Sequence, residues 1–284
     1  MSVTVFEIRE MTGVDIEPAV AMYKAGGRGE RREFLEWVLA NPVTQPLVGV
    51  RGGSLVSTAM ATINGSVGWV GSIFVDPSMR SQGYGRSMTE AACSLIDAAG
   101  CKTQALIASE YGKPLYDSMG FRVDALYQIL EAVPLATAPA PPLGRTLRPM
   151  RSDDIDRVCQ LDCRATGENR RGLLGALGAL DGRAWVLEAG DELLGFLASL
   201  LPGCGALVAP RLEDAACLLD QLRYLDNGRT KTVRAAVPRP KSAGVDALEQ
   251  LGWSPTFQAP RMLRGSDVGW DPSLIWSILG FAFG

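Results

Sequence analysis

Hydrophobic residues recur along the chain with two spacings, one typical of strands and the other typical of helices. In the first half these spacings predict strands at 3–9, 46–51, 55–63, 69–75, 104–108 and 123–130, and helices at 15–39 (broken at Gly26-Gly27), 83–99 and 113–119. In the second half they predict strands at 146–148, 185–189, 193–200 and 232–236, and helices at 154–162, 173–180, 214–225 and 245–251. Strands and helices are mixed in both halves, which predicts an α/β fold with α+β mixed sheets.

A proline- and alanine-rich segment separates the two halves. Residues 132–144 read AVPLATAPAPPLG. Prolines remove backbone donors and favour an extended chain, so this segment is predicted to be a semi-rigid linker. A chain of 284 residues also suits two domains. We therefore expect domains at 1–131 and 145–284.

The two halves resemble repeats of one unit. Arg9-x-Met11 followed by Asp15-Ile16 returns as Arg148-x-Met150 followed by Asp154-Ile155. Val75-x-Pro77 returns as Val208-x-Pro210, and Met119-Gly120-Phe121 returns as Leu251-Gly252-Trp253. The order is kept and the offset is nearly constant, which predicts a duplicated α/β unit.

Composition limits the chemistry that the chain can perform. There is no histidine, so a general acid or base must be Tyr, Asp, Glu, Lys, Cys, a terminus or water. The six cysteines form no Cys-x-x-Cys pair, so we expect reduced, buried thiols and no metal site. A net charge of −3 argues against nucleic-acid binding and mildly favours cationic ligands.

The ends of the sequence carry no pattern typical of membrane targeting. The first residues lack a basic region followed by an apolar stretch. The most apolar tail, residues 274–284, is too short to span a bilayer. A cytoplasmic protein that does not bind membranes is therefore expected. The oligomeric state stays open, a homo-oligomer included.

Residues 75–86, VDPSMRSQGYGR, lead from an apolar strand into a helix and form a candidate anion site. Gly83 and Gly85 allow the backbone to approach a ligand, while the N–H groups and dipole at the helix start favour negative charge. Arg80 and Arg86 add charge for phosphate. Met88 stands where the dinucleotide fingerprint needs glycine, and the segment has no P-loop lysine. Taken alone, such a turn could serve only helix packing.

With LYDSMGF at 115–121, this segment resembles the GNAT superfamily of acyl-CoA-dependent N-acetyltransferases. Residues 8–11 and 15–16 are similar to the first strand and helix of that family. Residues 108–116 and three segments after the linker (161–162, 208–210 and 261–265) resemble bacterial tandem proteins. In those proteins an N-terminal GNAT domain precedes a divergent C-terminal one.

The resemblance implies an acetyl-CoA site and assigns roles within it. Ile73, Phe74 and Val75 would lie on a splayed fourth strand that pairs with the pantetheine arm. The pyrophosphate would be held by Arg80, Ser81, Gln82, Gly83, Tyr84, Gly85 and Arg86. Ser109 stands where many relatives have an asparagine that binds the pantetheine. Tyr116 matches the tyrosine that protonates the CoA thiolate, although its position also suits a core aromatic.

The acceptor is expected to be a primary amine of a small molecule, attacked directly in a ternary complex without a metal. The general base stays open. Glu110 is favoured because it follows the fifth strand, and Glu30 and Glu33 are further candidates, although each also suits a solvated surface carboxylate. Water relayed to a carbonyl, or a carboxylate at Gly284, would serve as well.

The second half lacks the residues of the anion site. Glu213, Asp214, Ala216 and Leu218 replace Arg80, Ser81, Gly83 and Gly85, and Leu248 replaces Tyr116. One CoA site, in the first half, is therefore expected. Two other functions fit the same pattern: an acyltransferase that uses another acyl-CoA or a carrier-protein thioester, and a non-catalytic CoA-binding sensor.

Overall fold

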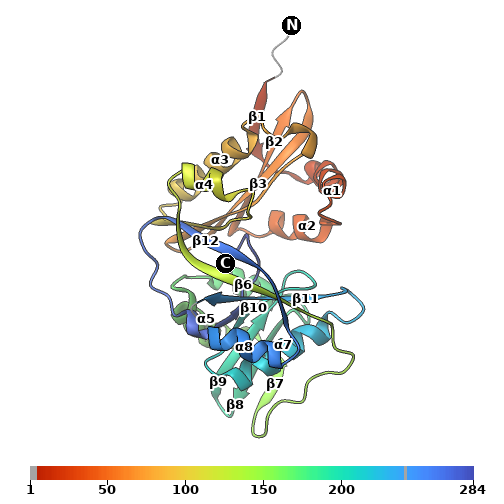
Figure 1. Cartoon of the computed structure of the whole chain (residues 1–284), viewed down its shortest axis with the longest axis vertical. Coiled ribbons are helices and arrows are strands. Elements are labelled where there is room, and N and C mark those ends of the chain that lie inside the picture. Colours follow the sequence, from red (N-terminus) through yellow and green to blue (C-terminus); the bar gives the residue numbers. More distant parts are fainter. Residues whose placement is uncertain (1–4, 240–241) are drawn as a thin grey trace.

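Two sheets, the first mixed and the second antiparallel, organise the computed structural model, which describes residues 5–239 and 242–284 (Figure 1). The first sheet has eight strands in the order β1-β2-β3-β4-β5-β12-β6-β11, and the second has five in the order β13-β10-β9-β8-β7. The elements before the linker are β1 (Phe6–Glu10), α1 (Ile16–Ala25), α2 (Arg32–Ala40), β2 (Thr44–Arg51), β3 (Ser54–Asn64), β4 (Val67–Val75), α3 (Tyr84–Ala98), β5 (Thr103–Ile107), α4 (Lys113–Ser118) and β6 (Arg122–Ala132). Those after it are β7 (Thr146–Pro149), α5 (Ile155–Thr166), α6 (Arg171–Gly178), β8 (Ala184–Ala189), β9 (Glu192–Ala198), β10 (Ala206–Val208), α7 (Leu212–Leu225), β11 (Val233–Arg239), α8 (Ser242–Gln250), β12 (Ser254–Gly265) and β13 (Ile275–Ser277).

The predicted strands and helices are present within a few residues of their expected ends, and the α/β fold is confirmed. The start of the first predicted strand, residues 3–4, lies outside the described residues. Three strands were not predicted. β10 and β13 have only three residues each, and β12 contains Pro255 and Pro260 and begins with a run of exposed residues. Local hydrophobic spacing gives a weak signal for all three.

The two sheets do not divide at the linker, because β12 from the second half lies between β5 and β6 of the first. β12 pairs antiparallel with β5, from Arg261 opposite Ile107 to Gly265 opposite Thr103. On its other side it pairs with β6, and β6 pairs in turn with β11. In Figure 1 these long strands cross the middle of the molecule between the two groups of helices. The first sheet is therefore complete only when the second half is folded.

Helices cover both faces of the first sheet. α3 and α4 pack on one face, where Met88, Ile96 and Tyr116 share a core with Val70. α1 and α2 pack on the other face, in a core that continues into the second half. No helix in the described part of the chain is both long and apolar enough to cross a bilayer.

The repeated Arg-x-Met…Asp-Ile motif forms the same structure twice. The Arg9 guanidinium donates to both oxygens of Asp15 at 2.7 Å. Arg148 donates to both oxygens of Asp154 at 2.6 and 2.8 Å. The paired arginine lowers the pKa of both carboxyls, to about 2 for Asp15. The repeated Arg-x-Met…Asp-Ile motif thus corresponds to a bidentate ion pair at the start of α1 and again at the start of α5.

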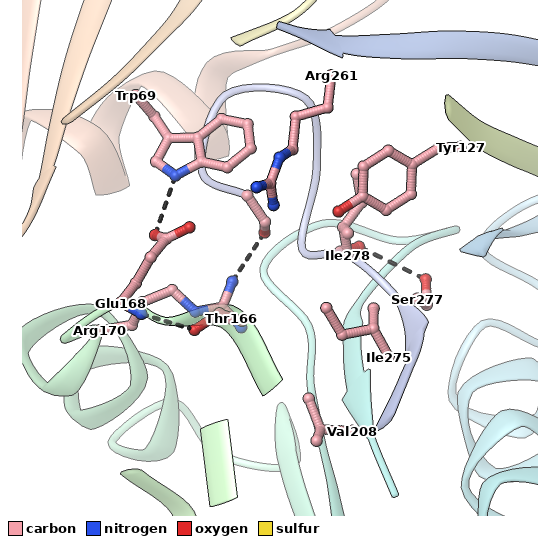
Figure 2. Close-up of a pocket in the computed structure, with 11 residues that line it drawn as sticks. Trp69, Tyr127, Thr166, Glu168, Arg170, Val208, Arg261, Ile275, Ser277 and Ile278 are labelled. Carbon is pink, nitrogen blue, oxygen red and sulfur yellow. Dashed lines mark hydrogen bonds between the residues drawn. The ribbon is translucent and has the colours of Figure 1, made fainter. Parts of the chain in front are cut away.

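A buried polar cluster joins the two halves (Figure 2). Arg170 donates to Asp162 at 2.9 and 2.5 Å and to the main-chain oxygen of Gly284 at 2.9 Å. Glu168 accepts from Asn64 at 2.8 Å and from the indole of Trp69 at 3.0 Å, and burial raises its pKa. The space left within the cluster is about 10 Å³, room for one water. Glu168 therefore links the second half directly to Asn64 and Trp69 of the first half, while Arg170 connects Asp162 to the C-terminal residue.

Replacing Asp162 with Asn should lower the free energy of unfolding by about 3–5 kcal/mol, because the buried Arg170 charge would lose its partner. Urea denaturation measures the change. Asp156→Asn is the matched control on the same helix, since the Asp156–Arg171 pair is exposed and such pairs contribute about 0–1 kcal/mol. Equal midpoints for the two variants would contradict the role given to Asp162.

Candidate functional site

The fourth strand parts from the fifth halfway along its length. β4 pairs with β5 only from Val67 opposite Thr103 to Trp69 opposite Ala105, after which β5 pairs with β12 alone. On its other side β4 stays paired with β3. Within residues 5–239 and 242–284, no strand pairs with the β5 side of residues 70–75. This segment is a free sheet edge to which an extended ligand could add.

A bulge lies at the point where the strands part. Ser72 has φ 51°, in the left-handed region, and the register with β3 shifts between Thr58 and Met60. The Thr58 hydroxyl donates to the Ser72 carbonyl at 3.0 Å and lies 2.7 Å from the hydroxyl of Tyr23 on α1. Beyond the bulge, Phe74 faces the α1–α2 core, and Ile73 faces the α3–α4 core. No sequence signal predicted this bulge.

The turn that follows β4 presents unpaired backbone N–H groups to solvent. Ser81 and Gly83 have φ of 61° and 85°. The N–H groups of Ser81, Gln82 and Gly83 find no acceptor in the described part of the chain, and the first N–H groups of α3 lack helical partners. A Cβ on Gly83 would meet no atom within 4 Å, and one on Gly85 would meet none closer than 3.8 Å. This geometry fits a diphosphate.

Side chains of the turn at 81–86 are held by contacts with neighbouring elements. The carboxamide oxygen of Gln82 accepts from Arg51 at 3.0 Å, and the ring of Tyr84 stacks on Phe6 with centroids 4.2 Å apart. Arg86 donates to the Ser118 hydroxyl at 2.5 Å and lies 3.7 Å from the Glu90 carboxylate. Sequence reasoning missed Arg51 and Phe6, which lie on other strands.

Arg80 extends back along the chain toward β4. Its Nε donates to the Val75 carbonyl at 3.2 Å, and its guanidinium lies over the Phe74 ring, 5.7 Å from the ring centroid. The charge of Arg80 therefore lies beside β4, whereas the charge of Arg86 lies beside α4.

Tyr116 lies in the α3–α4 core, 8% exposed, with its ring edge-on to Phe121. Burial raises the pKa of its hydroxyl to about 12, so the hydroxyl holds its proton at neutral pH. A Cβ on Gly112 would come 2.9 Å from the ring, which explains the glycine there. The Ser109 hydroxyl accepts from the Gly112 N–H at 3.1 Å and is exposed.

The candidate bases differ in their surroundings. Glu110 is exposed after β5, and no hydrogen bond or ion pair to the described residues engages its side chain. Glu30 is paired with Lys24, which lowers its pKa. Glu33 lies in the first turn of α2. The main-chain oxygen of Gly284 accepts from the buried Arg170.

In the second half, the place that corresponds to the free edge of β4 is occupied by the chain itself. β13 pairs with β10, with Leu207 opposite Ser277, on the side of β10 away from β9. That side corresponds to the free edge of β4. At the start of α7, Arg145 is paired with Glu213 and Asp214, and Leu218 is fully buried.

Comparisons with known proteins identify the class. A model of the acetyltransferase (GNAT) family matches residues 13–121, and a model of a GNAT acetyltransferase domain matches residues 158–273. The chain belongs to the GNAT acetyltransferases and contains two GNAT domains in tandem, as the sequence resemblance predicted. This family generally uses acyl-CoA as its acyl donor.

Solved structures share the whole architecture. A proposed acetyltransferase from Pyrococcus horikoshii has 20% identity and a TM-score of 0.82, covering 100% of this chain and 98% of that one. A tandem GNAT protein of the clavulanic acid pathway has 15% identity and a TM-score of 0.66, covering 93% and 100%. A GCN5-related N-acetyltransferase from Sphaerobacter thermophilus has 16% identity and a TM-score of 0.63, covering 94% and 98%. At these identities the likeness concerns the fold. A search of curated proteins found no match.

Proposed function

We propose that the first domain transfers an acetyl group from acetyl-CoA to a primary amine of a small molecule, by direct attack in a ternary complex. The observation that supports this most strongly is the continuity of the free edge of β4 with the turn at 81–86. A thioester carrier needs both: an unpaired strand for its amide-containing arm and a set of N–H groups for its diphosphate.

The residues of the site suit the steps of this reaction. The N–H groups of residues 73–75 would pair with the pantetheine arm, and one of them would polarise the thioester carbonyl, a contribution of about 2.7–4 kcal/mol in enzymes where such a donor has been removed. As the amine nitrogen forms its bond to the carbonyl carbon, the C–S bond breaks. The Tyr116 hydroxyl would give its proton to the departing sulfur. Glu110 or water would take the proton that the amine loses.

The second domain, for which we propose residues 145–284 against 1–131 for the first, would act as a structural or substrate-shaping partner and would contribute β12 to the first sheet. Its cleft is closed by β13, and the start of α7 carries carboxylates that would repel a diphosphate. We further propose a cytoplasmic location.

One acetyl-CoA should therefore bind per chain. Substitutions in the turn at 81–86 should abolish the heat of binding. Isothermal titration calorimetry measures this stoichiometry, and thiol release across a panel of primary amines measures transfer. Two equivalents per chain would contradict the single-site proposal. Tight binding with no thiol release on any amine would favour a non-catalytic CoA sensor, and faster release from a longer acyl-CoA or a carrier-protein thioester would reassign the donor.

A further inference from the structure

Two arginines in the loop between α1 and α2 are not neutralised. The other basic residues at the borders of this loop have carboxylate partners: Lys24 is paired with Glu30, and Arg32 lies 2.6 Å from Glu17. Arg28 and Arg31 have no carboxylate partner anywhere in residues 5–239 or 242–284. The Nε of Arg31 donates to the Arg28 carbonyl at 3.5 Å, a long bond that links the two residues.

Aromatic rings contact both guanidinium groups, and one of these rings, Phe74, belongs to the splayed part of β4. Arg28 lies over the Phe74 ring, 5.9 Å from its centroid. Arg31 lies 5.7 Å from the ring centroids of both Tyr23 and Phe34. An aromatic face holds a guanidinium in place while leaving its N–H groups able to bind an anion.

The loop is fitted closely against this part of the strand. A Cβ on Gly26 would come 2.2 Å from the Phe74 ring, so glycine is required for α1 to end there. Tyr23 is fixed through Thr58 to the bulge at Ser72. The positions of the arginines are therefore coupled to the segment of β4 beside which the acyl group would lie. They are on the α1–α2 side of the sheet, away from α3 and α4 (Figure 1).

The second domain borders the same loop. Arg31 is near enough to Cys204 to oppose the burial that raises the pKa of that thiol to about 11. Glu33 is within electrostatic reach of Arg183, whose pKa is lowered by burial and by Arg229. Residues of the second domain, Arg183 and Cys204 among them, thus lie near the loop between α1 and α2, and Asp226 also acts on Arg183.

We propose that the acceptor amine carries an anionic group, a carboxylate or a phosphate, which Arg28 and Arg31 bind while the amine reaches the acyl group beside β4. This inference rests on the acyl transfer proposed above and names the class of its acceptor. A guanidinium donates two parallel hydrogen bonds to either anion.

The test compares primary amines in matched sets, each with a free carboxylate, a carboxamide or a phosphate at the same place. Thiol release gives kcat and KM for the native protein, for the double variant Arg28→Gln/Arg31→Gln, and for the control Arg32→Gln, whose arginine is already paired. We expect the native protein to prefer an anionic acceptor by about 10- to 100-fold in KM, as charged hydrogen bonds contribute elsewhere. The preferred anion, carboxylate or phosphate, identifies which of the two is bound.

The double variant should lose that preference while its KM for acetyl-CoA and its turnover of the carboxamide stay within about twofold, the usual limit for a distant charge at the surface. Arg32→Gln should keep the preference. Equal use of charged and neutral amines by the native protein would overturn this inference and leave the transferase intact. Succinyl-CoA, whose acyl group carries a carboxylate, gives a further check. If the double variant changed only the KM for succinyl-CoA, the inference would also be overturned, because the arginines would then bind the acyl group and not the acceptor. No turnover with any amine would remove the proposed function and this inference with it.

Discussion

Replacing Tyr116 with Phe is expected to lower kcat by about 10²–10⁴-fold, the usual contribution of a positioned general acid, with the Kd for acetyl-CoA changed less than twofold. The ring would keep its place against Phe121 and Gly112, so the variant loses only the hydroxyl. Thiol release measures kcat, and calorimetry measures the Kd.

The pH dependence sharpens this prediction. Burial disfavours the phenolate and raises the pKa of Tyr116 to about 12, so the proton that the acid must donate is present at lower pH and is lost only as pH rises toward 12. We therefore expect no fall in kcat caused by this residue between about pH 9 and 11, where an ordinary tyrosine loses its proton.

Tyr111 provides the control, since its side chain is 95% exposed. Tyr111→Phe should leave kcat unchanged. An unchanged kcat in Tyr116→Phe, together with a changed unfolding midpoint, would show that Tyr116 is only a core residue.

Local patterns in the sequence predicted much of the first domain. The turn at 83–86 could be predicted because Gly83 and Gly85 stand between an apolar strand and a helix together with the LYDSMGF segment, and Gly83 has φ 85°. The repeat could be recognised because both halves keep the residues of the same bidentate ion pair, Arg9–Asp15 in the first and Arg148–Asp154 in the second.

What could not be predicted depends on contacts between distant residues. The place of β12 between β5 and β6 is fixed by pairing across more than a hundred residues, for which a single sequence carries no register signal. The closure of the second cleft by β13 has the same origin. The net charge suggested a cationic ligand, but the charge around Arg28 and Arg31 depends on which carboxylates are already paired, and only the fold shows that.

Replacing Gly83 with Glu should abolish acetyl-CoA binding, with Kd raised by at least about 100-fold, because a carboxylate at the start of α3 would repel the diphosphate that the N–H groups would bind. The backbone at φ 85° adds strain of about 1–2 kcal/mol. A side chain there meets no atom of the protein within 4 Å, so the fold should persist. Calorimetry measures the Kd and circular dichroism the fold.

A substitution at Gly100 distinguishes the effect of backbone strain from the effect of a negative charge beside the ligand. This glycine follows the other end of α3, has φ 77° and also has no neighbour within 4 Å of a Cβ. Gly100→Glu carries the same left-handed backbone strain and should lose more stability than Gly83→Glu, because the helix dipole disfavours a carboxylate at the C-terminal end of α3. It should still bind acetyl-CoA normally, while Gly83→Ala should bind with an intermediate Kd. Since the two glutamates differ only in the end of α3 that they occupy, equal binding by both would mean that the diphosphate lies elsewhere on the protein.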